Sequence, residues 1–221
     1  MSKCLMCREK VQERQLFSEI LLLKRKKNSL CPDCQLEFEP ISSPICQLCY
    51  KKSQITPCSD CLYWESQGKE VHHQALYHYN DKMMEYFSLY KFHGDYLLRK
   101  VFANEVKLAL LSHKDFTIVP IPISDQRQEE RGFNQVTAIL EETGLPFLPL
   151  LEKEHSQKQS EKKRSERLKT AQIFQLDDQY SVPEKIILVD DIYTTGATIQ
   201  LAKALLMKKG AKTIKTFSVA R

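Results

Sequence analysis

Four Cys-x-x-Cys pairs near the start of the chain constrain its fold more than any other feature. All eight cysteines of the 221 residues fall within the first 61, as the pairs Cys4/Cys7, Cys31/Cys34, Cys46/Cys49 and Cys58/Cys61. A Cys-x-x-Cys turn can direct two sulfur atoms at one metal ion, so two such turns complete a tetrahedral zinc site. We therefore expect two structural zinc ions in an N-terminal module of residues 1–65, followed by a second domain of residues 66–221.

Other uses of the cysteines, and other pairings of the turns, are open at this point. Disulfides are disfavoured in a reducing compartment, a thioredoxin-like motif needs only one such turn, and an iron–sulfur cluster is a further alternative. Sequential pairing would give two zinc ribbons in tandem, and interleaved pairing a cross-brace. Only 8 residues separate Cys49 from Cys58, a compact hairpin that favours sequential pairing. Because the cysteines supply eight ligands, His72, His73 and His78 are expected at the surface or in the core.

The composition is that of an ordinary globular chain, with 42% hydrophobic and 28% charged residues. No apolar run reaches the roughly 18 residues that a membrane-spanning helix needs, and the opening MSKCLMCREK has no apolar signal region. We therefore expect a cytoplasmic protein without membrane insertion. The net charge of +5 permits a polyanionic partner without requiring one.

Strand and helix patterns alternate after the cysteines, which predicts an α/β domain with a mostly parallel sheet flanked by helices. Apolar residues at helical spacing indicate helices over 81–92, 95–111, 131–142 and 197–210. Apolar or alternating runs indicate strands over 69–80, 116–123, 145–152, 185–191 and 213–221. The polar stretch 153–169 has seven Lys or Arg against three Glu and is expected to be an exposed loop or a frayed helix.

The stretch KIILVDDIYTTGATIQ, residues 185–200, carries the strongest signal for a ligand. Asp190 and Asp191 follow a buried strand, at the edge where ligands of parallel sheets bind. The small residues that come next can direct backbone N–H groups and a helix N-terminus at a phosphate; they are Thr194, Thr195, Gly196, Ala197 and Thr198. The two carboxylates suit sugar hydroxyls or the water shell of a magnesium ion. The stretch therefore predicts a site for a ribose 5-phosphate derivative, and a capped helix without a ligand is the alternative.

The segment VDDIYTTGAT resembles the phosphoribosyl pyrophosphate motif of type I phosphoribosyltransferases. The order of cysteine pairs, YKFHGD, VPIPIS, RGFNQ, SEKKRSERLK and FSVAR resembles the competence protein F family (ComFC) over nearly the whole chain. The resemblance implies a double zinc ribbon fused to a phosphoribosyltransferase-like domain. It also implies a role in bringing transforming single-stranded DNA into the cytosol, at the inner face of the membrane, with the competence helicase of the same operon as a partner.

The resemblance also implies roles for single residues. Asp190 and Asp191, the candidate catalytic pair, would hold the ribose hydroxyls of magnesium-bound phosphoribosyl pyrophosphate, and residues 194–198 its 5-phosphate. The turn Pro122–Ser124 would approach the pyrophosphate, Lys91 would add a positive charge, and three residues would flank the entrance: Arg127, Arg131 and Asn134. A flexible basic loop would close over the leaving group and is the candidate contact for DNA; its cations are Lys158, Lys162, Lys163, Arg164 and Arg167.

Three functions are compatible with these features. The first is a competence protein that helps the uptake of single-stranded DNA and contains a phosphoribosyl pyrophosphate-binding domain. The second is an active phosphoribosyltransferase that releases pyrophosphate with an unknown acceptor, and whether turnover occurs is left open. The third is a scaffold whose zinc ribbons recruit a helicase. Tyr63 and Trp64 could stack on DNA bases, but aromatic residues beside a zinc site usually pack under it.

Overall fold

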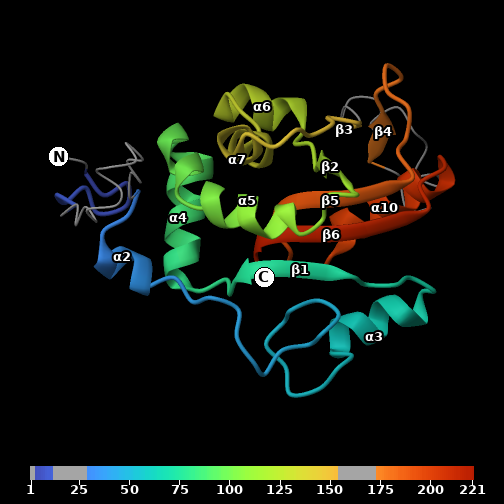
Figure 1. The fold of residues 1–221 in the computed structure, drawn as a ribbon, viewed down its shortest axis with the longest axis horizontal. Helices are drawn as coiled ribbons and strands as arrows, with labels where there is room; N and C mark the ends of the chain where they lie inside the picture. The colour runs from blue at the N-terminus through green and yellow to red at the C-terminus, as the bar shows by residue number, and fades with distance from the viewer. Residues whose placement is uncertain (1–2, 12–28, 154–172) are drawn as a thin grey trace.

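The computed structural model describes residues 3–11, 29–153 and 173–221. Its centre is a sheet of four parallel strands in the order β1-β6-β5-β2, flanked by helices (Figure 1). The strands are β1 (His73–Tyr77), β2 (Thr117–Pro120), β5 (Lys185–Ile192) and β6 (Thr213–Ala220). A separate antiparallel pair is formed by β3 (Leu151–Lys153) and β4 (Phe174–Leu176). The predicted α/β class with a parallel sheet is confirmed.

Strand β5 shows why both faces of the sheet are covered. Successive side chains of a strand point to opposite faces, and all four residues from Ile186 to Val189 are buried. Ile187 and Val189 belong to one hydrophobic cluster, together with residues of α4 (Asp81–Phe92), α5 (Ala103–Leu111) and α7 (Gln135–Thr143). Ile186 and Leu188 belong to a second cluster, together with residues of α10 (Ala197–Lys208). The continuous apolar run therefore fills two cores, one on each face.

The helices match the expected segments with two differences, except that the helix over residues 125–131 was not expected. Their bounds are α4 (Asp81–Phe92), α5 (Ala103–Leu111), α6 (Asp125–Arg131), α7 (Gln135–Thr143) and α10 (Ala197–Lys208). The segment expected as one helix over 95–111 divides into a short 3₁₀ helix, η1 (Tyr96–Lys100), and α5. The helix expected from residue 131 begins later, because Gly132 ends α6 with a φ of 82° and Asn134 caps the start of α7.

The expected strand over 145–152 is formed only at its end, as β3. The backbone of Leu148 still donates a hydrogen bond to Ile118 of β2, at 2.8 Å. Two prolines, Pro146 and Pro149, lie in this segment, and a proline has no N–H to donate to a sheet. This composition accounts for a segment that runs along β2 without becoming a fifth strand.

The two cysteine-rich segments are built alike. Residues 3–10 and 45–52 each close a turn with an antiparallel bridge between the end residues. Each turn has a residue with positive φ directly after its second cysteine, Arg8 at 64° and Tyr50 at 62°. The next Cys-x-x-Cys pair then begins a helix, α2 (Pro32–Leu36) in the first segment and α3 (Ser59–Ser66) in the second. The repeated geometry agrees with the expected tandem arrangement.

The two segments lie in different places on the α/β unit. Figure 1 shows α2 near one end of α4 and α3 on the outer side of β1. Cys4, Cys31 and Cys34 belong to the hydrophobic cluster that contains α4, whereas the four cysteines of the second segment belong to the cluster that contains α10. Within the described ranges, no helix combines the length and the apolar character needed to cross a membrane.

Candidate functional site

Asp190 and Asp191 lie within β5 rather than after its end. Their strand was expected over 185–191, with the acids at its end, but it continues to Ile192, and Asp190 is paired in register with Ser218 of β6. Asp191 is 5% exposed, and Asp190 is half-buried. The acids are thus part of the sheet's carboxyl edge, where rigid strands hold them in place.

An ion pair joins Asp191 to α4. The Nζ of Lys91 lies 2.7 Å from Oδ2 of Asp191, and both side chains are largely buried. Within the described residues this oxygen accepts no hydrogen bond of good geometry, so its contact with Lys91 is an ion pair. The Oδ1 of Asp191 accepts the N–H of Ile192 at 2.7 Å, and Oδ1 of Asp190 accepts the N–H of Asp191 at 2.8 Å. These bonds orient each carboxylate.

Residues 194–198, which we call the threonine loop, connect β5 to α10. Gly196 precedes the first residue of α10 with a φ of 83°, and no side chain caps this helix through that position. A Cβ at Gly196 would lie 2.2 Å from the hydroxyl of Tyr193, so only glycine fits. The loop therefore presents a helix N-terminus, with its partial positive charge, beside the two acids.

A cavity of about 720 Å³ lies between the acids, the threonine loop and the helices α4 and α6. It joins acidic, basic and hydroxyl groups that are distant in the sequence. Its ionisable and hydroxyl side chains are Lys91, Arg127, Glu130, Arg131, Lys153, Asp190, Asp191, Thr194 and Thr198. A cavity with cations opposite two carboxylates suits a ligand that carries phosphate groups together with hydroxyls or a divalent cation.

The pKa values of three side chains that line the cavity are shifted toward the uncharged form. Burial, and then the negative charge of Asp191, raises the pKa of Asp190 to about 7. Burial, and then the positive charge of Arg127, lowers the pKa of Lys153. Burial also lowers the pKa of Arg131, with Asp191 opposing. Like charges held near one another are stabilised when a ligand of opposite charge binds, and displaced pKa values of this kind are common at functional sites.

The predicted site residues divide into three groups. Lys91, Arg127, Arg131, Pro122 and both acids line the cavity together with Thr194 and Thr198. Thr195, Gly196 and Ala197 lie in the threonine loop but do not line the cavity. Ser124 and Asn134 cap helices instead, Ser124 at the start of α6 and Asn134 at the start of α7. The predicted loop cations lie outside the described residues: Lys158, Lys162, Lys163, Arg164 and Arg167.

Six lining residues were not singled out from the sequence, and two of them, Lys153 and Phe92, are informative. Lys153 ends β3 and is the first cation of the basic stretch, so its position there was a usable signal. Phe92 ends α4 within the YKFHGD motif and keeps 80% of its surface exposed at the cavity. A helical pattern alone assigns Phe92 to a core face, and only the structure places it at the mouth of the cavity.

The eight cysteines form two clusters by sequential pairing. The first cysteine cluster is Cys4, Cys7, Cys31 and Cys34, and the second is Cys46, Cys49, Cys58 and Cys61. All eight are free thiols, so the disulfide alternative is wrong. Sulfur pairs lie 3.5 Å apart for Cys49 and Cys58 and 3.8 Å apart for Cys46 and Cys61. Zn–S bonds of about 2.3 Å place tetrahedral sulfur ligands roughly 3.8 Å apart, so the clusters fit zinc.

The histidines near the cysteines are not members of these clusters. His73 is buried in β1, where Thr216 and Ser218 of β6 each lie 2.9 Å from one of its ring nitrogens. Burial lowers its pKa well below the ordinary value, with Arg221 adding to the shift. The expectation that the histidines belong to the core or surface therefore holds for His73, which is a neutral core residue.

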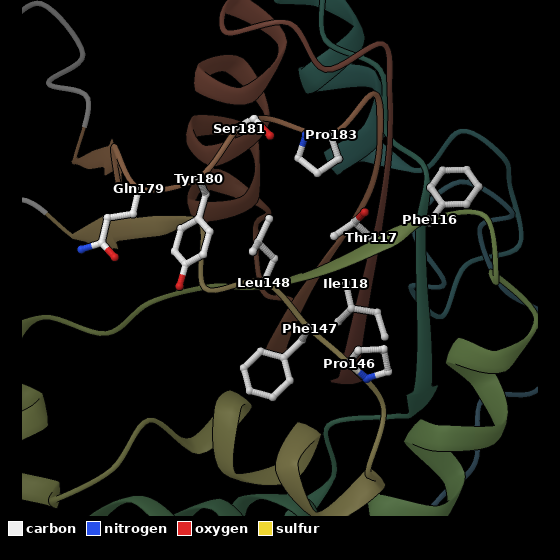
Figure 2. A pocket seen from close by; sticks show the side chains of 10 residues that line it. All are labelled: Phe116, Thr117, Ile118, Pro146, Phe147, Leu148, Gln179, Tyr180, Ser181 and Pro183. Carbon is white, nitrogen blue, oxygen red and sulfur yellow. The ribbon is translucent and has the colours of Figure 1, made fainter.

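A second cavity, of about 560 Å³, lies at the other end of the strands. Figure 2 shows its ten lining side chains, which come from residues 116–118, 146–148 and 179–183. None of these is an acid or a base other than Tyr180, and most are apolar. It lies near the amino ends of β2 and β5, opposite the edge where parallel sheets bind ligands. The cavity at the two acids is therefore the better candidate.

Comparison with known proteins identifies the family. No family model matches the chain. It is 45% identical to Competence protein ComFC of Streptococcus pneumoniae (strain ATCC BAA-255 / R6) over 219 residues, 99% of this chain and 100% of that protein. Identity is 33% to Competence protein ComFC of Bacillus subtilis (strain 168), over 99% of this chain and 94% of the relative. Competence protein F of Haemophilus influenzae is 27% identical over 88% of this chain and 91% of its own. At such identity over its full length, the chain belongs to the ComFC family of competence proteins.

Proposed function

We propose that this protein acts in natural transformation and binds magnesium-bound phosphoribosyl pyrophosphate in the cavity at the carboxyl edge of its sheet. The observation that carries the proposal is the pair Asp190–Asp191 held between the threonine loop and a group of cations. The loop suits the 5-phosphate, the carboxylates suit the ribose hydroxyls or magnesium, and the cations suit the pyrophosphate. The relatives' names supply the role in competence.

The proposal includes two structural zinc ions, one in each cysteine cluster. Each cysteine cluster offers four sulfur ligands, and four thiolates closed around one ion are typical of structural rather than catalytic zinc. In each cluster a backbone N–H points at a sulfur, from Cys34 to Cys31 and from Cys58 to Cys46, both at 3.4 Å. Such bonds stabilise thiolate charge, which supports metal binding.

The alternative function is a phosphoribosyltransferase with an unidentified acceptor. In that reaction the C1–O bond to pyrophosphate breaks as the acceptor's electron pair bonds to C1. Lys91, Arg127 and Arg131 would stabilise the negative charge of the departing pyrophosphate. The acids would hold the ribose in position, and an effect of this kind depends on orientation. The observation that supports this alternative is the position of the three cations in the cavity.

Single-stranded DNA and the competence helicase of the same operon are the proposed partners. Phe92 is an exposed aromatic ring at the cavity that the cations line, and aromatic rings combined with cations form stacking sites for single-stranded nucleic acid. The basic stretch that connects β3 and β4 begins at this cavity with Lys153. We therefore expect DNA to approach the same mouth that admits phosphoribosyl pyrophosphate, so the two ligands should compete.

The test of the ligand site is the double variant Asp190→Asn with Asp191→Asn, studied by titration calorimetry with magnesium phosphoribosyl pyrophosphate. We expect binding to be lost while the thermal unfolding transition remains. Asp177→Asn with Asp178→Asn is the matched control, since these adjacent acids lie in a turn after β4. Unchanged affinity in the first variant, or equal loss in both, contradicts the proposal.

The DNA contact is tested by the salt dependence of binding. Each phosphate contact on a single strand contributes about −0.7 to the slope of log affinity against log salt concentration. Replacing Lys162, Lys163 and Arg164 by Gln should flatten the slope by about 2. The control replaces Lys208, Lys209 and Lys212, near the far end of α10, by Gln. An unchanged slope in the loop variant would exclude the basic stretch as the contact.

A further inference from the structure

The second cysteine cluster is bonded to the threonine loop through two side chains, Trp64 and Arg221. Trp64 follows Cys61 by one turn of α3, and its Nε1 donates to the carbonyl of Thr195 at 2.7 Å. Arg221 donates from Nη1 to the carbonyls of Tyr193, at 3.3 Å, and Thr194. Three consecutive carbonyls, of residues 193–195, are thus held by side chains that also contact the cluster or its helix.

Arg221 contacts the cluster as closely as it contacts the loop. Its Nε donates to the carbonyl of Cys49 at 3.2 Å, and its Nη2 lies 3.5 Å from the sulfur of Cys49. The same Nη2 donates to Oδ2 of Asp60 at 2.8 Å. The side chain is only 7% exposed. A buried guanidinium with its donors occupied on two sides is a rigid link, and its planar fork fixes the geometry of both partners.

The carbonyl bonds determine which way the loop's donors point. In a trans peptide the N–H points opposite to the C=O. Holding the carbonyls of Tyr193, Thr194 and Thr195 toward the second cluster therefore turns the next three N–H groups away from it. Thr194 and Thr198 line the ligand cavity, so the loop has its cavity side and its cluster side on opposite faces. The bonds to the cluster set the orientation that a phosphate would need.

Aromatic stacking closes the back of the loop. The ring of Tyr193 stacks on His73 at a centroid distance of 4.0 Å, and the guanidinium of Arg221 lies 4.9 Å from the centre of the same ring. The hydroxyl of Tyr193 fills the space beside Gly196. The stack packs behind the loop, and a movement of the loop away from the cluster would break its bonds to Trp64 and Arg221.

We propose that the second cysteine cluster, through Trp64 and Arg221, positions the threonine loop, so that the integrity of this zinc site sets the affinity for the phosphate end of the ligand. This inference depends on the proposed function for the identity of that ligand. Trp64 and Arg221 are positioning residues, because their contacts are with the back of the loop. The first cysteine cluster has another place in the fold and no such role.

The experiment compares Trp64→Phe, Arg221→Gln and Arg221→Lys with Arg8→Gln, a control at an arginine next to the first cluster. Magnesium with ribose 5-phosphate and magnesium with inorganic pyrophosphate are titrated separately. Each of Trp64→Phe and Arg221→Gln removes hydrogen bonds that hold the back of the loop, so we expect about 5- to 100-fold weaker binding of ribose 5-phosphate in both variants. Pyrophosphate affinity should change less than about twofold, and Arg221→Lys should recover part of the loss by keeping the charge.

Hydrogen exchange of the peptide spanning 193–199 supplies a readout that needs no ligand. We expect faster exchange in Trp64→Phe and Arg221→Gln, with two zinc ions per chain retained, and no change in Arg8→Gln. If the unmodified protein binds neither ligand, the proposed function fails, and exchange alone still decides the positioning role. Unchanged exchange in both variants overturns the inference, and so does an equal loss of affinity for both ligands.

Discussion

The two cysteine clusters have the same local construction but different surroundings. In each, a first Cys-x-x-Cys turn ends with a positive-φ residue and a second one begins a helix. Around the first cluster, the polar links to the α/β unit include an ion pair between Arg8 and Asp95 in which the Arg8 side chain is 58% exposed. Around the second, buried groups of Trp64 and Arg221 reach the threonine loop. The same structural unit therefore packs against the α4 side of the fold in one place and contacts the threonine loop in the other.

Removing a cysteine from each cluster is the strongest test of this comparison. Cys34→Ser and Cys61→Ser each remove one of four sulfur ligands, so each should reduce the zinc content from two ions to one. Structural zinc contributes roughly 10–16 kcal/mol in small zinc-binding peptides, so the loss of an ion should be a large effect. Both should lower the free energy of unfolding, since both cysteines are buried in the main hydrophobic clusters. Only Cys61→Ser should weaken binding of ribose 5-phosphate strongly. The measurements are metal analysis, chemical denaturation and calorimetry, and equal ligand affinity in the two variants would remove the distinction.

A pair of glycines tests the same difference without touching a cysteine. Gly196 and Gly94 both have positive φ, but only at Gly196 would a Cβ collide with a side chain. We expect Gly196→Ala to cost about 1–3 kcal/mol or more in backbone strain and displaced packing, and to abolish binding of the phosphate. Gly94→Ala, near Asp95, should cost about 1 kcal/mol and leave affinity unchanged.

Thermal unfolding measures the stability of the two glycine variants, and calorimetry measures their affinity for the ligand. If Gly94→Ala weakens the ligand as much as Gly196→Ala does, the loop is not the phosphate site. A Gly196→Ala protein that binds normally would mean that Tyr193 moves aside at little cost.

The acids beside the threonine loop make this part of the molecule sensitive to pH. Burial, and then Asp191, raises the pKa of Asp190 from 3.8 to about 7. Between about pH 4 and pH 7 the folded chain therefore keeps a proton that the unfolded chain has released. Raising the pH through this window lowers the free energy of unfolding, by at most about 1.4 kcal/mol for each step of one in pH.

Asp190→Asn removes that dependence. We expect the variant to be more stable than the parent at pH 8 by about 1–4 kcal/mol, and similar to it near pH 4. In the parent, affinity for the magnesium-bound ligand should rise as the pH increases through about 7, because the charged carboxylate is the form that binds it. Denaturation curves at both pH values, with Asp178→Asn as the control, test this. A variant that is less stable at pH 8 would contradict the raised pKa.

The sequence predicted the parts of the fold that rest on local pattern. The apolar run before Asp190 and the helix after Gly196 were evident, because burial of a strand and the amphipathic period of a helix are properties of neighbouring residues. The ion pair of Asp191 was not evident, because its partner Lys91 is contributed by α4 from far along the chain.

The same reasoning applies to the candidate site. The residues of the threonine loop and the acids could be found from the spacing in one short segment. The bonds from Trp64 to Thr195 and from Arg221 to Cys49 join residues more than 130 positions apart, and no local pattern encodes such pairs. Trp64 had two interpretations from its position after Cys61, stacking on bases or packing under zinc, and the structure favours packing.

The smallest expected effect comes from a pair of aspartates, one beside each cluster. Asp60 accepts hydrogen bonds from Lys51 at 2.9 Å and from Arg221 at 2.8 Å. These bonds outweigh burial and hold its pKa below the ordinary value. Asp95 caps η1 through the N–H of Leu97 and pairs with Arg8. Both acids are partly exposed, so neither substitution should cost more than about 1 kcal/mol of stability.

The two aspartates should nevertheless differ in their effect on the ligand. Asp60→Asn keeps the shape of the side chain but removes the charge that holds Arg221, so the guanidinium should loosen while its bond to the carbonyl of Cys49 remains. We expect ribose 5-phosphate to bind about two- to fivefold more weakly, corresponding to roughly 0.4–1 kcal/mol. Asp95→Asn should reduce stability by a similar amount and leave affinity unchanged, because its partners lie beside the first cluster. If calorimetry shows the same affinity for both variants, the other contacts of Arg221 hold the guanidinium in place and the charge of Asp60 has no part in the link.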